Sequence, residues 1–141
     1  TRRSSDLGFF KPESSHNLGL PGFVQEAGAV ALEQDLAEVL DMKMEFKLRR
    51  DKAVELLSHS SMLQLTSPAA GMFLMVNIES TGLSGLEFSK RLYQEKGVSV
   101  LDGAEFGPSG QGFIRISFAT STDSIIEGCK RIVSFADSLN N

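Results

Sequence analysis

Three short apolar runs in the C-terminal half of the chain have the character of β-strands. They occupy residues 72–78 ("MFLMVNI"), 98–103 ("VSVLDG") and 113–118 ("FIRISF"). Aromatic and β-branched residues are enriched in these runs, and turn-forming glycines and serines lie between them. One segment with helical spacing separates the first two runs, and another follows the third. We therefore predict an α/β (α+β) fold in which helices cover a short three-stranded sheet.

The two helices of this predicted domain have recognisable signals. Ser84 and Glu87 have the spacing of a capping box, which predicts a helix that runs through Lys96 and stops at Gly97. A final helix is predicted for residues 123–139, because its apolar residues recur on one face. That stripe consists of Ile125, Ile126, Cys129, Ile132, Val133 and Ala136.

The N-terminal half has a different pattern. Residues 36–63 contain neither glycine nor proline, which predicts one helix, or two nearly collinear ones, longer than the globular average. We interpret residues 21–62 as a helical connector between domains and residues 63–141 as a small domain. Residues 1–20 show no period and are interpreted as an irregular segment or a remnant. Since no initiator methionine precedes them, we expect a fragment or a processed chain.

Composition narrows the class of protein. The chain has 141 residues, of which 41% are hydrophobic and 23% charged, values typical of a soluble globular protein. Its net charge of −4 argues against a nucleic-acid or anionic-membrane partner. No apolar run approaches the roughly 20 residues that a spanning helix needs. The single cysteine, Cys129, excludes a disulfide within the chain and fits a reducing compartment, so we expect a cytoplasmic location.

Most motifs with catalytic potential have a simpler structural interpretation. Gly107 and Gly112 have phosphate-loop spacing, but Phe113 stands where the lysine is required and a strand follows, so a turn is favoured. His16 and His59 have no partner at metal-ligand spacing, and we expect both to be exposed.

Two other groups are likewise expected to be structural. Cys129 lies on the apolar stripe of the last helix, which favours a buried thiol. The triplet Arg49, Arg50 and Asp51 is interpreted as a solvated face of the long helix.

Arg115 is the residue that the fold alone does not explain. Alternation along the strand places Ile114, Ile116 and Phe118 on one face, which would pack against the helices. Arg115 then lies on the opposite face, which must contact solvent, a second domain or a ligand. The arginine is either exposed or ion-paired on a half-open sheet, or it is held by the strand to bind a carboxylate or phosphate through two parallel hydrogen bonds.

Several stretches resemble one enzyme family, in family order over residues 20–141. The strand and helix "FIRISFATS…TDSIIEGCKRI" resemble the closing segment of class I/II, fold-type-I pyridoxal-phosphate-dependent aminotransferases. "PGFVQEAGAVALE" and "MEFKLRRDKAVELL" resemble the family's interdomain helix and the stretch before it. "PAAGMFLMVNI" and "GVSVLDGAEFG" resemble the first two strands of its small domain, with Asp102-Gly103 in place of the usual Pro-Gly. The chain thus resembles the C-terminal part of such an enzyme.

The resemblance implies a function. In this family the arginine of the matching strand receives the α-carboxylate of the substrate, and Arg115 is that position. The substrates would be an L-amino acid and a 2-oxo acid, the cofactor pyridoxal 5'-phosphate, and the assembly a homodimer. The resemblance assigns no catalytic, cofactor-binding or metal-binding residue to this chain, because the Schiff-base lysine belongs to the large domain. Lys90 instead lies on a predicted small-domain helix. The chain alone is therefore expected to be inactive.

Two other functions stay open at this point. A decarboxylase, lyase or synthase with the same cofactor would use the same carboxylate-binding arginine, since a fold does not determine a reaction. A non-catalytic module that kept the small-domain fold would lack the lysine-bearing domain altogether.

Overall fold

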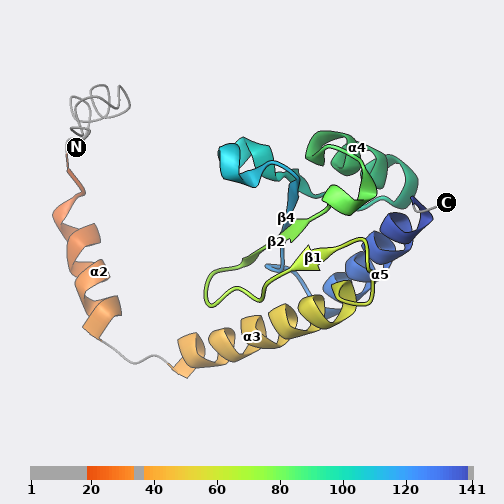
Figure 1. Cartoon of the computed structure of the whole chain (residues 1–141). Coiled ribbons are helices and arrows are strands. Elements are labelled where there is room, and N and C mark those ends of the chain that lie inside the picture. Colours follow the sequence, from red (N-terminus) through yellow and green to blue (C-terminus); the bar gives the residue numbers. More distant parts are fainter. Residues whose placement is uncertain (1–18, 34–36, 140–141) are drawn as a thin grey trace. The chain divides into compact units, whose positions relative to one another are not determined.

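The computed structural model describes residues 19–33 and 37–139, so His16 lies outside the described residues. Contacts divide the chain into two parts after Val39. In the first part, α2 (Gly22–Glu33) has no buried residue. The second part contains the long helix α3 (Ala37–Leu57) beyond its first residues, and everything that follows it (Figure 1). The division of the chain at residues 20 and 62 stays a prediction.

The sheet of the second part has four antiparallel strands in the order β1-β2-β4-β3. They are β1 (Gln64–Leu65), β2 (Phe73–Asn77), β3 (Leu101–Asp102) and β4 (Phe113–Ser117). The α/β class is confirmed, but the expectation of three strands was wrong. The additional strand, β1, is only two residues long, too short to produce an alternating pattern in the sequence.

One face of the sheet forms the core. Leu74 and Val76 of β2 and Ile114 and Ile116 of β4 are all buried on this face. The amphipathic helices α4 (Gly85–Lys96) and α5 (Thr122–Ser138) pack against it, and the rings of Phe88 and Phe135 meet edge to face at 5.0 Å between them. The predicted burial of Ile114, Ile116 and Phe118 is confirmed.

The predicted ends of α4 are also confirmed. The Ser84 hydroxyl accepts a hydrogen bond from the backbone N–H of Glu87 at 3.2 Å. At the other end Gly97 adopts a left-handed conformation, with φ of 66°, and its N–H donates to the carbonyl oxygen of Tyr93. These contacts satisfy backbone groups that the helix leaves without an internal partner.

Helix α3 is attached to the sheet domain through its C-terminal half, where Ala53 and Leu57 are buried. The expected solvated face at Arg49 and Arg50 was wrong, because their side chains are only 20% and 22% exposed. Arg49 bonds to Glu45, which also accepts a hydrogen bond from the Thr122 hydroxyl at the start of α5.

Arg50 also bonds to a segment outside α3. Its guanidinium bonds to Asp51 at 2.7 Å and donates to the Pro68 carbonyl oxygen at 3.1 Å. It thereby ties α3 to the loop that leads into β2. Arg50 therefore does more than solvate the helix, because it also bonds to the loop before β2.

Two glycines hold together the loop between β3 and β4. Short 3₁₀ turns at Gly103–Phe106 and Pro108–Gly110 bring Gly103 and Gly110 into direct backbone contact. A Cβ atom on Gly103 would lie 2.5 Å from the Gly110 carbonyl oxygen, and one on Gly110 would overlap the Gly103 carbonyl. The Asp102 carboxylate accepts a hydrogen bond from the Ala104 N–H at 3.0 Å and caps the first turn, so a turn survives where the family usually has proline.

We expect Gly110→Ala to lower the free energy of unfolding by about 1–3 kcal/mol, because the added methyl group overlaps a backbone carbonyl that cannot move freely. The matched control is Gly128→Ala in α5, where an added Cβ meets no atom within 4 Å. That control should be stabilised by roughly 0.5–1 kcal/mol, since alanine favours a helix interior. Urea denaturation measures both. Equal effects of the two substitutions would contradict the proposed contact.

Candidate functional site

Arg115 lies at the centre of the face that the helices leave uncovered. On β4 it stands between Met75 of β2 and Leu101 of β3, which are its cross-strand partners. The buried Ile114 and Ile116 precede and follow it, so its side chain projects from the opposite face. The side chain is half-buried. The strand therefore presents the Arg115 cation from the face of the sheet opposite to the core.

Two aromatic rings contact the Arg115 guanidinium. Its Cζ atom lies 4.2 Å from the ring centroid of Phe73 and 3.8 Å from that of Phe106. Phe73 is on β2 and Phe106 in the turn after β3, so the rings reach the arginine from the two strands that flank β4. Both distances are within the range of a favourable cation–π contact.

Arg115 has no acidic partner in the part of the chain that the structure describes. The other four arginines in that part each pair with a carboxylate at 2.7–3.0 Å, in the pairs Arg49–Glu45, Arg50–Asp51, Arg91–Glu95 and Arg131–Glu127. Among them, Arg115 alone is held by rings instead of an anion. Its N–H donors are thus available to a planar anionic acceptor such as a carboxylate.

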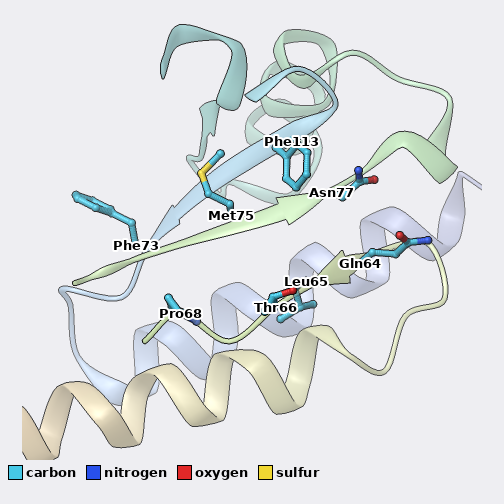
Figure 2. Close-up of a pocket in the computed structure, with 8 residues that line it drawn as sticks. All are labelled: Gln64, Leu65, Thr66, Pro68, Phe73, Met75, Asn77 and Phe113. Atoms are coloured by element: carbon cyan, nitrogen blue, oxygen red, sulfur yellow. The ribbon is translucent and has the colours of Figure 1, made fainter. Parts of the chain in front are cut away.

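A pocket of about 500 Å³ lies on the face of the sheet that carries Met75, the cross-strand partner of Arg115. Figure 2 shows the residues that line it. Phe73 and Met75 of β2 and Phe113 of β4 line it; Met75 pairs with Arg115, and the Phe73 ring contacts its guanidinium. The Asn77 amide bonds to Glu79 at 3.1 Å, so it is already partly satisfied. No charged side chain lines the pocket, whose full lining is Gln64, Leu65, Thr66, Pro68, Phe73, Met75, Asn77 and Phe113.

The remaining candidate residues lie apart from this face. Cys129 is buried in the core at 1% exposure, as predicted, and burial raises the pKa of its thiol from 9.0 to about 11. His59 is exposed just after α3, and Lys90 is exposed on α4. Within residues 19–33 and 37–139 no three His, Cys, Asp or Glu side chains gather as a metal site would require. The helices described there also lack the length and apolar character to cross a bilayer.

The described residues do not form a pyridoxal-phosphate site. That cofactor needs a lysine inside a pocket together with ligands for its phosphate and ring nitrogen. The pocket beside Arg115 contains no lysine, and Lys90 projects into solvent on another element. A second hollow, beside α3, is lined by Lys43 and Lys47, but both side chains are exposed. Neither of these two hollows in the described part of the chain thus has the lysine and phosphate ligands that the cofactor needs.

Comparison with known proteins identifies the family. The model of the family "Aminotransferase class I and II" matches residues 10–132. The chain belongs to the class I and II aminotransferases. An arginine–pyruvate transaminase of Pseudomonas aeruginosa is 42% identical over 121 residues, which are 86% of this chain and 31% of that protein.

Solved aminotransferase structures have the same fold. The aromatic aminotransferase of Pyrococcus horikoshii superposes with a TM-score of 0.76 at 29% identity, over 84% of this chain and 32% of that one. A PLP-bound protein of Clostridium difficile assigned as an aminotransferase superposes with a TM-score of 0.60 at 26% identity, over 64% of this chain and 24% of that one. The chain therefore spans about a third of the length of the aminotransferases that it matches.

Sequence reasoning identified Arg115 but missed the two rings that contact it. Alternation along residues 72–78 could have placed Phe73 on the same face as Met75. It could not have shown that this face adjoins Arg115, because strand order and register are not readable from one strand. For Phe106 the sequence contained no signal beyond its position in a glycine-rich loop of this aminotransferase domain.

The raised pKa of Cys129 predicts a specific pH dependence. Near pH 9 the unfolded chain releases the thiol proton, whereas the folded chain retains it up to about pH 11. The folded state then binds more protons, so stability falls as the pH rises through this window, by up to about 2–3 kcal/mol. Urea denaturation at pH 8 and pH 11 should show a larger loss for the unchanged chain than for Cys129→Ala. Equal losses of stability in the unchanged chain and in Cys129→Ala would contradict a raised pKa of the folded thiol.

Proposed function

We propose that the chain is the substrate-gripping part of a pyridoxal-phosphate-dependent aminotransferase, which transfers an amino group between an L-amino acid and a 2-oxo acid. In this proposal Arg115 binds the α-carboxylate that both substrates share. The single observation that carries it is the state of Arg115: a half-buried cation, held by a rigid strand and two rings, with no carboxylate partner in the described chain.

The proposed binding mode follows from the geometry of the guanidinium and carboxylate groups. A guanidinium and a carboxylate are both planar and join through two parallel N–H···O bonds, which determine orientation as well as position. Such a grip would fix the substrate relative to the reacting groups and so lower the entropic part of the barrier. The neutral pocket next to Arg115 leaves room for the rest of a substrate without adding a competing charge.

We further propose that another part of the parent protein holds the pyridoxal phosphate. The family membership and the PLP-bound relative support this cofactor for the complete protein. In this arrangement residues 63–141 are the small domain and residues 21–62 connect it to the large one. The names of the relatives differ in amino acid, arginine in one and aromatic in another, so we leave the amino donor unassigned.

The exposed apolar side chains of the helical segment support a larger assembly. Phe23 and Leu32 are 75% and 89% exposed, and several residues of α3 are more than half exposed. Such surface is usually covered by protein. We propose that the large domain covers it and that the complete enzyme is a homodimer in the cytoplasm. The exposed apolar residues of α3 are Val39, Leu40, Met42, Met44 and Leu48.

The proposal predicts the effect of removing the guanidinium in the full-length protein. Arg115→Ala should raise the KM values for both the amino acid and the 2-oxo acid by about ten- to a hundredfold, because a charged bidentate hydrogen bond is lost. Cofactor content, read from absorbance near the pyridoxal band, should stay unchanged. Activity is measured by supplying L-arginine or L-tyrosine with pyruvate or 2-oxoglutarate and detecting the new amino acid and the new oxo acid.

Arg131→Ala is the matched control, since Arg131 is an exposed arginine on α5 that pairs with Glu127. Its loss should leave both KM values unchanged. An Arg115→Ala protein with normal KM values would refute the assigned role of the arginine. Carbon dioxide release or elimination without a new amino acid would instead indicate a decarboxylase or lyase.

A further inference from the structure

We propose that Phe73 and Phe106 are positioning residues that hold the Arg115 guanidinium ready to bind a planar carboxylate. This inference rests on the proposed function of Arg115 and adds the reason why its side chain is ordered before substrate arrives. The two ring contacts, at 4.2 Å and 3.8 Å, are the interactions of the guanidinium that the structure shows. Together we call Phe73 and Phe106 the aromatic clamp.

The clamp restrains the arginine without consuming its hydrogen bonds. A guanidinium stacks on an aromatic ring through its flat face, whereas its N–H donors point outward in its own plane. A carboxylate partner within the chain would occupy those donors and compete with substrate. The rings stabilise the half-buried charge and leave the N–H edge free. They therefore favour a planar acceptor that approaches this edge.

Each ring is placed by backbone contacts on its own side of β4. The residue next to Phe73 is fixed by the bond from the Phe118 N–H to the Met72 carbonyl oxygen at 3.0 Å. Phe106 ends the 3₁₀ turn that Asp102 caps and that the Gly103–Gly110 contact closes. The two rings belong to different segments of the chain, so they contact the guanidinium from two separate elements.

Core packing does not account for the two rings. Phe73 is 41% exposed and Phe106 49% exposed, and both lie outside the buried cluster that stabilises the domain. An apolar ring at such a position gains little from burial. Its contact with Arg115 gives each ring a role that its exposure would otherwise leave unexplained.

Restraining the Arg115 side chain before a ligand arrives affects the affinity for that ligand. An arginine that is free in solution must lose rotamer freedom when it grips a ligand, and each such side chain costs about two- to tenfold in affinity. A clamped arginine has lost that freedom during folding. Removing one ring should therefore weaken carboxylate binding while leaving the reacting groups in place.

The test uses Phe106→Leu and Phe73→Leu in the full-length protein, since leucine keeps apolar bulk but has no ring. Each variant should raise the KM for pyruvate, the probe oxo acid, by about two- to tenfold, with kcat at saturating pyruvate changed less. Phe106→Tyr should restore the original KM, because tyrosine retains an aromatic face. Tyr93→Leu, which removes an exposed ring on α4, is the matched control and should change neither constant.

A double-mutant cycle with Arg115→Lys separates the clamp from general structural damage. A lysine ammonium has no flat face to stack and keeps only the weaker cation–π attraction, so Phe106→Leu should raise the KM of the Arg115→Lys protein by a smaller factor than that of the unchanged protein. Additive effects of the two substitutions would overturn the clamp. The clamp would also be overturned if the leucine variants had unchanged KM values while Arg115→Lys raised the KM. In that case the proposed function of Arg115 would stand. If Arg115→Lys itself leaves KM unchanged, the proposed function fails and the clamp fails with it.

Discussion

The pairing of β2 with β4 is the constraint on which the rest of this domain depends. Five residue pairs, from Phe73–Ser117 to Asn77–Phe113, lock the two longest strands together in one register. In that register Leu74, Val76, Ile114 and Ile116 all point into the core. A slip of β4 by one residue would turn Ile114 and Ile116 out of the core and bury Arg115 among the helices without a partner, at a cost of several kcal/mol. The core therefore determines on which face the arginine lies.

The helices stabilise this pairing from one side only. Helices α4 and α5 cover the apolar face, and α3 is joined to the domain through Glu45 and Arg50 and through its buried C-terminal half. The opposite face remains half-open, with a neutral pocket beside Arg115. This half-open face leaves the Arg115 side chain only half-buried.

The charge of Arg115 is stabilised differently from that of the other four arginines in the described residues. Arg49, Arg50, Arg91 and Arg131 are neutralised by carboxylates, three of them at helical spacing. Two of these arginines also lie over a ring, Arg49 over Phe46 and Arg91 over Phe135. Arg115 has the rings without the carboxylate in the described chain. The absence of an anionic partner in the described residues is what distinguishes Arg115 from the other four arginines.

Local signals in the sequence were sufficient to determine the ends of α4, the helix α5 and the two faces of β4. The cap at Ser84, the stop at Gly97, the apolar stripe of α5 and the alternation around Arg115 depend on neighbours within a few residues. Only the tertiary structure decided the strand order, the two-residue strand β1, and the meeting of Phe73 and Phe106 at one guanidinium. These features join residues about 10 to 40 positions apart, and such contacts depend on how the whole core packs, which no local pattern records.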